Sequence, residues 1–357
     1  MKQPVYVIAE IGVNHNGDYD KAISLIDVAV KAGANAVKFQ SFVPEKLAAR
    51  NLKKADYQHH GDSAPDQLSM LQNMAMPEQW YSPIIGYCKE QGIDFLSTAF
   101  DQQSLQLLNK HKVKTYKVAS GEITNLPLLW QTGQFAKNII LSTGMSNLAD
   151  IELALANLAH SFLHQSQPVN TDEVFIAYHS VAGQAALSER VTILHCTSQY
   201  PAPDKAICLN ALETIANAFK LAVGYSDHSQ DLLVSSLAVA KGATIIEKHI
   251  TLSHDLPGPD HKASLEPHEF YDFVKQIRRT ELILGSGVKS AQSCELQTKL
   301  IARQTLVASM VIKQGELFSL ANLTTQRTGI DAASPTKIWD LLNTPALKTY
   351  QAGDPID

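Results

Sequence analysis

Eight short apolar runs recur along the first 250 residues, and most of them turn polar at their C-terminal end. The runs occupy residues 5–10, 36–40, 94–100, 115–120, 138–144, 191–198, 221–228 and 244–250. Helical patterns lie at residues 19–32, 77–91, 102–110, 149–160, 211–218, 232–241 and 267–284. Strands that alternate with helices pair in parallel, and eight such units predict a (β/α)8 TIM barrel with its active site at the C-terminal strand ends. A doubly wound open sheet is the alternative, but no G-x-G-x-x-G follows the first run.

Polar residues stand at the ends of these runs, and alternation along a strand tells which of them face inward. Glu10 shares a face with Tyr6 and Ile8, so we expect it inside the barrel. The other candidates are Lys38, Gln40, Thr98, Lys117, Ser120, Glu122, Ser142, Thr143, His195, Thr197 and Ser198. Two lysines that converge with several hydroxyl groups form an anion site suited to phosphate or carboxylate. The alternative is structural: each hydroxyl serves a turn or a cap, and Glu10 and Glu122 pair with the lysines.

Two neighbouring strands in this pattern each end in a histidine. Ser226 and His228 share one face of the strand at 221–228, and Glu247 and His249 share one face of the next strand. Two imidazoles at the same end of adjacent parallel strands, with carboxylates and water nearby, suit Mn²⁺, Zn²⁺ or Fe²⁺. The alternative is that each histidine is a hydrogen-bonded polar cap on its strand.

Composition and charge argue against several classes of protein. The chain of 357 residues has a net charge of −5 and no basic cluster, so we expect no nucleic-acid partner. Its cysteines lack metal-ligand spacing and indicate reduced thiols; they are Cys88, Cys196, Cys208 and Cys294. The N-terminal sequence MKQPVYVIAEIGVN lacks a signal-peptide pattern, and no run reaches the ~18 apolar residues of a membrane span. We therefore expect a soluble, cytoplasmic protein without a membrane partner.

Two insertions and a change of pattern divide the chain. Residues 43–76 are polar and irregular and have the length of a lid over the mouth; they include Tyr57, His59, His60 and Asp62. Residues 161–189 are rich in Gln, Ser and Ala, and we expect a surface excursion there. We expect a barrel domain over 1–285, a linker over 286–300 and a small second domain over 301–357, with a strand-like run at 305–312.

Ten stretches spread over nearly the whole chain form a recognisable series. They read AEIGVNHNGD, AGANAVKFQ, FLSTAFD, YKVASGEITN, ILSTGM, ILHCTSQYPAP, VGYSDH, ATIIEKHITL, GPDHKASLEP and KQGELFSLANLTTQRTG. In this order they resemble the sialic acid synthase family, which comprises N-acetylneuraminate synthase and the related legionaminic and pseudaminic acid synthases. The resemblance implies a (β/α)8 barrel followed by a small antifreeze-like (SAF) domain.

The resemblance also implies a reaction. The family condenses phosphoenolpyruvate with the open-chain aldehyde of an N-acylmannosamine-type sugar, giving a nine-carbon 2-keto acid and phosphate, and it needs a divalent metal, Mn²⁺ or Mg²⁺. By position, His228 and His249 would be the metal ligands, and Glu10 would lie beside the reacting carbons. Phosphoenolpyruvate would be held by Lys38, Thr98, Lys117, Ser120, Ser142, Ser198 and Ser226. The sugar would be held by Gln40, Glu122, Tyr200, Asp260 and Arg327, the last from the small domain of the partner in a domain-swapped homodimer.

The family pattern leaves the acceptor sugar open. The expected acceptor is N-acetylmannosamine, and the alternative is the 2,4-diacetamido-2,4,6-trideoxyhexose of legionaminate or pseudaminate synthases. The stretch GPDHKAS is more similar to the neuraminate and legionaminate branches than to the pseudaminate branch. Two positions depart from the family: Ser198 replaces an asparagine of some members, and QRTG around Arg327 replaces KRPG, which makes that loop less rigid. An inactive carbohydrate-binding barrel and a metal-dependent aldolase or isomerase that does not use phosphoenolpyruvate are further alternatives.

Overall fold

In the computed structural model, residues 3–50, 52–54 and 64–357 are described. The chain divides into two compact units, Met1–Gly285 and Ser286–Asp357. Part of the expected lid lies outside the described residues, namely Tyr57, His59, His60 and Asp62. In the described part of that segment, two short helices are present: α2 (Pro44–Leu47) and α3 (Gln67–Met74).

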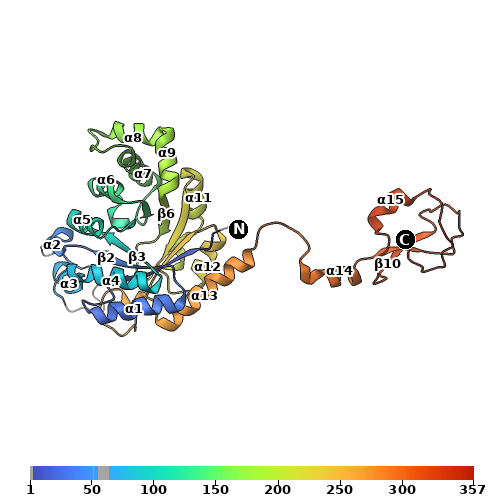
Figure 1. Ribbon diagram of the computed structural model, residues 1–357, viewed down its shortest axis with the longest axis horizontal. Helices are drawn as coiled ribbons and strands as arrows, with labels where there is room; N and C mark the ends of the chain where they lie inside the picture. The colour runs from blue at the N-terminus through green and yellow to red at the C-terminus, as the bar shows by residue number, and fades with distance from the viewer. Residues whose placement is uncertain (1–2, 51, 55–63) are drawn as a thin grey trace. The chain divides into compact units, whose positions relative to one another are not determined.

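The first unit is a closed barrel of eight parallel strands in chain order (Figure 1). The strands are β1 (Tyr6–Gly12), β2 (Ala36–Ser41), β3 (Asp94–Ala99), β4 (Thr115–Val118), β5 (Asn138–Ser142), β6 (Val191–Cys196), β7 (Ala222–Asp227) and β8 (Ile245–His249). β1 pairs with β8 from Tyr6 opposite Ile245 to Glu10 opposite His249, and this ladder closes the ring. The predicted (β/α)8 barrel is confirmed.

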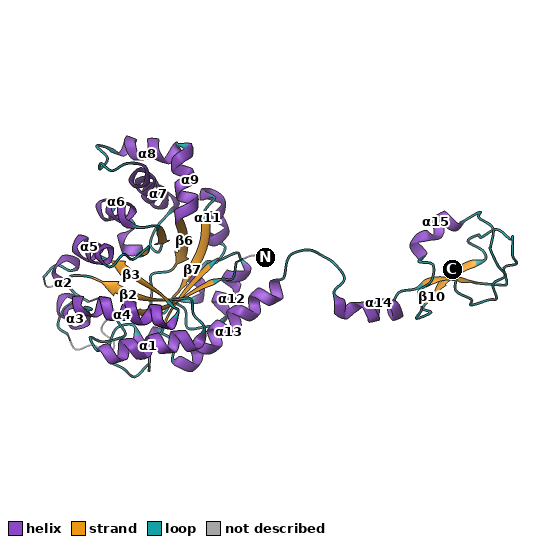
Figure 2. Cartoon of the chain, viewed as in Figure 1, coloured by secondary structure: helices purple, strands orange, loops and turns teal. Residues whose placement is uncertain are grey.

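Helices surround the strands (Figure 2). They are α1 (Tyr19–Ala32), α4 (Glu78–Gln91), α5 (Gln102–Lys110), α6 (Leu126–Phe135), α7 (Leu148–Leu163), α8 (Thr171–His179), α9 (Val181–Arg190), α10 (Asp204–Ile207), α11 (Ala211–Phe219), α12 (Leu233–Ala240) and α13 (Pro267–Leu284), with 3-10 turns η2 (Ser120–Glu122) and η3 (His261–Ala263). α1, α5 and α13 have the predicted bounds. α6, α8, α9 and α10 were not expected, and α8 and nearly all of α9 lie in the segment 161–189, which was interpreted as a surface excursion. None of the described helices has the length and apolar character needed to cross a membrane.

Apolar side chains are buried on both faces of the strands. The interior of the barrel holds Ile8, Ala36, Leu96, Ile140 and Leu194. A larger cluster between strands and helices includes Tyr116, Tyr225, Phe270 and Phe273. Burial on both faces explains why these strands read as near-continuous apolar runs. α1 contributes one stripe at helical spacing, formed by Ala22, Leu25, Ile26 and Ala29.

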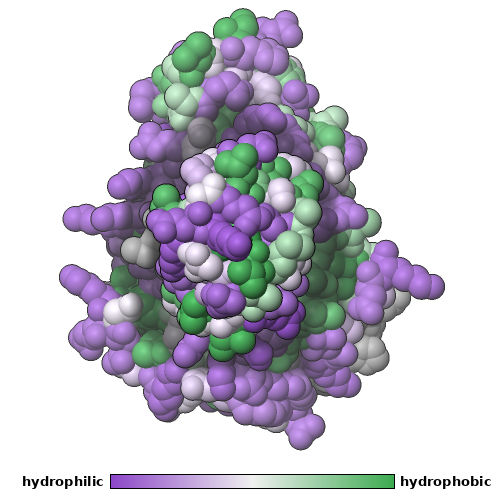
Figure 3. Space-filling view, turned by 90° about the vertical axis from the view of Figure 1, so that its right-hand side faces the viewer, coloured by the Kyte–Doolittle hydropathy of each residue, from purple (hydrophilic) through white to green (hydrophobic). Residues whose placement is uncertain are grey.

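The second unit is small and has little regular structure. It contains α14 (Leu296–Ala302), α15 (Ile338–Leu341), η4 (Ser293–Glu295) and η5 (Pro335–Lys337), and β9 (Thr305–Ala308) pairs antiparallel with β10 (Leu323–Gln326). β9 is shorter than the run predicted at 305–312, and α14 crosses the boundary predicted between linker and domain at residues 300 and 301. Its core includes Leu306, Ile312, Phe318 and Tyr350. Figure 3, which faces this unit, shows apolar residues among polar ones on its surface.

Candidate active site

A polar layer lies directly above the apolar interior of the barrel, two residues further along each strand. Its members are at most 5 % exposed and are Glu10, Lys38, Thr98, Lys117, Ser142, Cys196, Ser226 and Glu247. Six of them lie in the C-terminal half of their strands, and Lys38 and Glu247 lie near the middle of β2 and β8. Catalytic groups of (β/α)8 enzymes lie at the C-terminal strand ends, so this layer is the candidate active site.

Two lysines and two glutamates form one buried ionic network in the layer. Lys38 Nζ lies 2.8 Å from Glu10 Oε2 and 3.7 Å from Glu247 Oε2, and Lys117 Nζ lies 3.4 Å from Glu247 Oε1. Ser226 Oγ donates to Glu247 Oε1 at 2.8 Å. Because buried charges are costly without partners, Glu247, together with Glu10 beside Lys38, allows both lysines to be present before an anion arrives. Glu247 was not assigned a role from the sequence, although its position two residues before His249 places it on the same inward face.

The environment of this network gives the carboxyl groups of Glu10 and Glu247 very different pKa values. Burial raises the pKa of Glu10 to about 7, and the charge of Glu247 adds to the rise although Lys38 opposes it. Burial also acts to raise the pKa of Glu247, but Lys117 and Lys38 outweigh it and bring the pKa down to about 2. Burial lowers the pKa of Lys117, while the two glutamates raise the pKa of Lys38 against the effect of its burial. Glu247 therefore remains a fixed charge, and Glu10 can exchange a proton near neutral pH.

Hydroxyl groups gather beside the lysines around Gly144. The amide of Gly144 donates to Ser120 Oγ at 2.9 Å, and Ser120 Oγ shares a hydrogen bond with Cys196 Sγ at 3.1 Å. Lys38 Nζ donates to Thr98 Oγ1 at 3.3 Å. Ser142 Oγ is buried and has no hydrogen-bond partner in the described part of the chain. Ammonium, hydroxyl and amide donors in one pocket suit the oxygens of a phosphate.

Gly144 leaves no room for a side chain in this cluster. A Cβ atom there would lie 2.2 Å from Ser198 Oγ and 2.9 Å from Ser120 Oγ. We expect Gly144→Ala to displace both hydroxyls and to raise the KM for phosphoenolpyruvate, the anionic substrate that the family resemblance implies, about tenfold, the effect of losing one or two hydrogen bonds to a charged ligand. Steady-state kinetics measure this, with thermal unfolding to check the fold. An unchanged KM for phosphoenolpyruvate would remove this cluster from the anion site.

The two histidines lie above the polar layer, one at the end of β8 and one just after β7. Their ring centres are 5.7 Å apart. His228 donates Nδ1–H to the carbonyl of Thr197 at 2.7 Å, which leaves Nε2 as the atom with a lone pair. His249 Nδ1 is buried without a hydrogen-bond partner and lies 3.9 Å from Asp260 Oδ2. Burial lowers the pKa of His228 to about 4 and that of His249 well below its usual value, so both rings are neutral at pH 7.

These two imidazoles fit a shared divalent ion. With metal–nitrogen distances of about 2.1 Å, two ring centres on one ion lie about 4.5–6.5 Å apart. Neutral rings offer lone pairs, and the orphaned Nδ1 of His249 is a buried polar atom that needs a partner. Among the described residues, no group of three or more His, Cys, Asp or Glu side chains is arranged to hold a metal. The remaining ligands of an ion would therefore come from water and substrate.

The other expected sugar-binding residues are placed less uniformly. Gln40 Nε2 donates weakly to Glu10 Oε1 at 3.5 Å, and the ring of Tyr200 lies 4.1 Å from that of His228. Glu122 accepts from Asn125 Nδ2 at 2.7 Å in the turn that precedes α6. Arg327 belongs to the second unit, where it is exposed after β10. The structure thus brings Gln40 and Tyr200 to the barrel mouth, whereas Arg327 is described only within its own unit.

Some polar strand-end residues have structural partners instead. His195 Nε2 lies 2.7 Å from the carbonyl of Ile207, Thr143 Oγ1 donates to the carbonyl of Leu194, and Thr197 Oγ1 donates to that of Ala206. These three were among the candidates read from strand ends. Each of the three is one residue away from an inward-facing neighbour, so its side chain points away from the barrel interior. These side chains therefore stabilise the loops and not the site.

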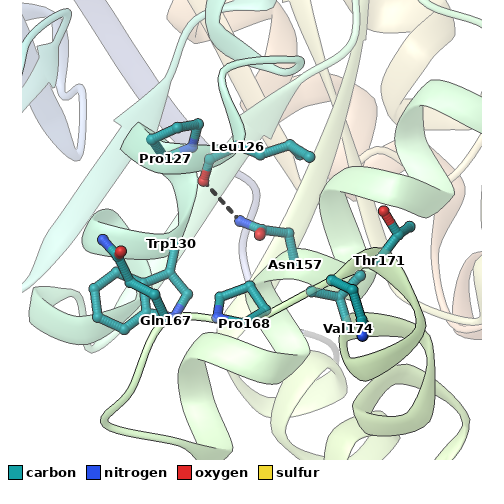
Figure 4. Close-up of a pocket in the computed structure, with 9 residues that line it drawn as sticks. Leu126, Pro127, Trp130, Asn157, Gln167, Pro168, Thr171 and Val174 are labelled. Carbon is teal, nitrogen blue, oxygen red and sulfur yellow. Dashed lines mark hydrogen bonds between the residues drawn. The ribbon is translucent and has the colours of Figure 1, made fainter.

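A surface pocket elsewhere in the barrel unit contains none of the expected site residues. It has a volume of about 270 Å³ and lies between α6, α7 and α8 (Figure 4). Trp130 and two prolines, Pro127 and Pro168, form walls, and Asn157 donates Nδ2 to the carbonyl of Leu126 at 2.9 Å. The mouth of the barrel remains the candidate active site.

Comparison with known proteins agrees with this architecture. Residues 25–289 match the model of the NeuB family. The chain belongs to the NeuB family. It is 42 % identical over 346 residues to the N,N'-diacetyllegionaminic acid synthase of Campylobacter jejuni serotype O:2. The aligned region covers 97 % of this chain and 96 % of that protein. The predicted family of sialic, legionaminic and pseudaminic acid synthases is therefore confirmed.

Two further relatives show how similarity is distributed within the family. The human N-acetylneuraminate-9-phosphate synthase is 28 % identical over 356 residues, 99 % of this chain and 92 % of that protein. The crystal structure of an N-acetylneuraminic acid synthetase from Leptospira borgpetersenii serovar Hardjo-bovis, in complex with citrate, matches with a TM-score of 0.67 and 30 % identity, over 83 % of this chain and 90 % of that one. The identity with the legionaminic acid synthase is thus higher than with these two proteins.

Proposed function

We propose that the protein condenses phosphoenolpyruvate with a 2,4-diacetamido-2,4,6-trideoxyhexose to give a legionaminic acid and inorganic phosphate. The observation that supports a phosphoenolpyruvate-dependent synthase is the buried pair of lysines, Lys38 and Lys117, beside Glu10 at the barrel mouth. An aldolase or isomerase that handles a neutral sugar has no need of two buried ammonium groups near the unpartnered hydroxyl of Ser142. The identity with a legionaminic acid synthase supports the choice of acceptor.

The residues of the polar layer divide the work of the reaction. Lys38, Lys117, Thr98, Ser120, Ser142, Ser198 and Ser226 hold the carboxylate and phosphate of phosphoenolpyruvate. Its C3 forms a bond to the aldehyde carbon of the open-chain sugar, which leaves positive character at C2. Glu10, as a carboxylate, stabilises this charge and takes a proton from the water that adds at C2. The C2–O bond to phosphate then breaks and the C2 hydroxyl loses its proton to give the 2-keto group. The former aldehyde oxygen becomes a hydroxyl with one of the two protons from water, and phosphate leaves with the other.

The acceptor and the metal complete the proposal. His228 and His249 would hold a divalent ion, Mn²⁺ or Mg²⁺, which supplies Lewis-acid polarisation of the aldehyde oxygen. Gln40, Glu122, Tyr200 and Asp260 bind the hydroxyl and acetamido groups of the sugar. Arg327 does so from a second copy of the chain, in a homodimer whose small domains are exchanged.

Phosphate release from phosphoenolpyruvate tests the proposed function. N-acetylmannosamine and the 2,4-diacetamido-2,4,6-trideoxyhexoses that yield legionaminic and pseudaminic acids are each offered with and without Mn²⁺. We expect kcat/KM to be at least about tenfold higher with the legionaminic precursor, a difference of ~1.4 kcal/mol. A preference for N-acetylmannosamine would restore the N-acetylneuraminate assignment. If none of the sugars led to phosphate release, the synthase proposal would be contradicted.

A further inference from the structure

Two loops meet at the seam where β1 and β8 close the barrel. One follows β1 and carries the sequence Val13-Asn14-His15-Asn16-Gly17, and the other runs from Ile250 to Glu266 and carries GPDHKAS. The reaction proposed above gives no role to the asparagines of the first loop. Both asparagines nevertheless bind the second loop, on either side of Asp260.

Asn14 binds both ends of that loop. It is fully buried, and its Nδ2 donates to the carbonyl of Ile250 at 2.8 Å and to Ser264 Oγ at 2.9 Å. Ser264 Oγ in turn donates to the backbone carbonyl of Asp260 at 2.6 Å. Asn14 therefore holds the residue after His249 and, through one hydroxyl, the backbone of Asp260.

Asn16 binds the N-terminal side of the loop and the residue next to Asp260. Its Nδ2 donates to the carbonyl of Pro257 at 2.7 Å, and its Oδ1 accepts from His261 Nε2 at 3.2 Å. On the other side of the ring, Nδ1 of His261 shares a hydrogen bond with Thr251 Oγ1 at 2.7 Å. The Asn16 side chain thus binds Pro257 and His261 directly and is linked to Thr251 through His261.

Gly258 shows how closely this crosslink is packed. Its φ is 145°, a value that L side chains rarely adopt. A Cβ atom at Gly258 would lie 2.8 Å from Cδ2 of His261 and 3.1 Å from Oδ1 of Asn16. The loop therefore passes over the Asn16–His261 pair with no space between them, and its path depends on that pair.

The crosslinks place a single side chain at the mouth. The carboxylate of Asp260 is 14 % exposed and lies 3.9 Å from Nδ1 of His249. The barrel itself does not need the crosslinks for closure, because β1 and β8 are already joined by the ladder from Tyr6 to Glu10, and Ile250 N donates to the carbonyl of Glu10 beyond it. What the crosslinks add is a fixed position for the loop that carries Asp260.

We propose that Asn14, Asn16, His261 and Ser264 form a clasp that positions Asp260 over the mouth, so that the loop after β1 determines how tightly the acceptor sugar binds. The proposal rests on the proposed function, in which Asp260 contacts the sugar. The clasp residues are positioning residues and touch neither substrate. Loss of the clasp weakens sugar binding and leaves the phosphoenolpyruvate site, which is held by β2 to β7, unchanged.

Asn16→Gly tests the clasp without straining the backbone. Asn16 has a φ of 52°, a conformation that glycine adopts freely, so only the side chain is lost. We expect the KM for the sugar to rise about tenfold, with the KM for phosphoenolpyruvate within about twofold of wild type, since about one to two net hydrogen bonds are removed. The matched control is Lys262→Ala, an exposed neighbour of His261 with no side-chain hydrogen bond or ion pair to any described residue, which should match wild type in both constants.

Hydrogen–deuterium exchange tests the clasp without any turnover. In the unliganded protein, amides of residues 253–264 should exchange about tenfold faster in Asn16→Gly than in wild type or Lys262→Ala. Gly258→Ala should act in the same direction, because its methyl group separates His261 from Asn16. Unchanged exchange in both variants would overturn the clasp. Faster exchange with equal increases in both KM values would overturn its assignment to the acceptor. If the wild-type protein turns over no sugar, the proposed function fails, and exchange still decides whether the clasp holds the loop.

Discussion

Glu10→Gln is expected to bind both substrates and to lose turnover by a factor of about 10²–10⁴, the usual contribution of a positioned general base. The amide keeps the shape of the carboxylate and its hydrogen bond with Gln40, so the site remains assembled. Lys38 keeps Glu247 as a partner 3.7 Å away, so its charge is not stranded. What the variant lacks is the negative charge beside C2 and the ability to take a proton from water. Kinetics of phosphate release measure the loss of turnover, and calorimetry of phosphoenolpyruvate binding shows whether the substrate still binds.

The pH dependence gives a second measure of the same residue. The pKa of Glu10 is raised to about 7, so its base form is lost as the pH falls below about 7. We expect kcat/KM for phosphoenolpyruvate to fall about tenfold per pH unit on that side, and we expect this limb to be absent from the residual activity of Glu10→Gln. Glu90→Gln, on the exposed face of α4, is the matched control and should keep both rate and limb. A variant at Glu10 with near-wild-type kcat would exclude the role.

Alternation along the strands accounts for most of what the sequence predicts correctly about the site. Ile8 and Glu10 are two residues apart, as are Ala36 and Lys38, and in the structure the polar member of each pair lies above the apolar one. The rule works because a strand inside a closed barrel has only two faces, and one of them must be filled. Alternation alone also predicts that Cys196 and Glu247 face inward, because they lie two residues before Ser198 and His249. Neither was chosen as a site residue from the sequence.

Helices without an amphipathic pattern and loops were predicted less well. α6 reads LPLLWQTGQF, in which apolar residues cluster at the N-terminal end and Pro127 and Gly133 interrupt the pattern, so its 3.6-residue period is weak. Local sequence signals were present: Asn125 caps its first turn by accepting from Leu128 N. The sugar-binding candidates Tyr200 and Asp260 lie on loops whose paths depend on long-range contacts such as those of Asn16. Sequence motifs therefore identify the family more readily than the acceptor.

The histidine pair connects these loops to the chemistry. Asp260 approaches His249 from the clasped loop, and the ring of Tyr200, on the loop after β6, lies tilted against that of His228. An acceptor bound between these loops would lie against both imidazoles and above Glu10. Under the proposed function, the electrophilic carbon would then lie between the metal that polarises the aldehyde and the anion site that holds the nucleophile.

His228→Ala and His249→Ala are expected to weaken Mn²⁺ binding by about a hundredfold each and to lower kcat/KM by a similar factor, since a missing ligand costs the site ~3 kcal/mol. A different observation supports each ring as a ligand. The hydrogen bond to the Thr197 carbonyl orients His228, and Nδ1 of His249 is a buried nitrogen with no other partner among the described residues. Neither change should unfold the barrel, because both residues lie at strand ends above its apolar interior.

Electron paramagnetic resonance of free Mn²⁺, titrated with the unliganded protein, measures binding without relying on activity. His268→Ala is the matched control, because that imidazole is exposed at the start of α13 and should leave Mn²⁺ binding unchanged. Supplying about a hundredfold more Mn²⁺ should restore part of the lost rate in each single variant, because one imidazole and the substrate oxygens remain as ligands. Wild-type Mn²⁺ affinity in both variants would instead place the metal elsewhere. The two rings would then be hydrogen-bonding groups for the sugar, and polarisation of the aldehyde would have to come from another part of the mouth.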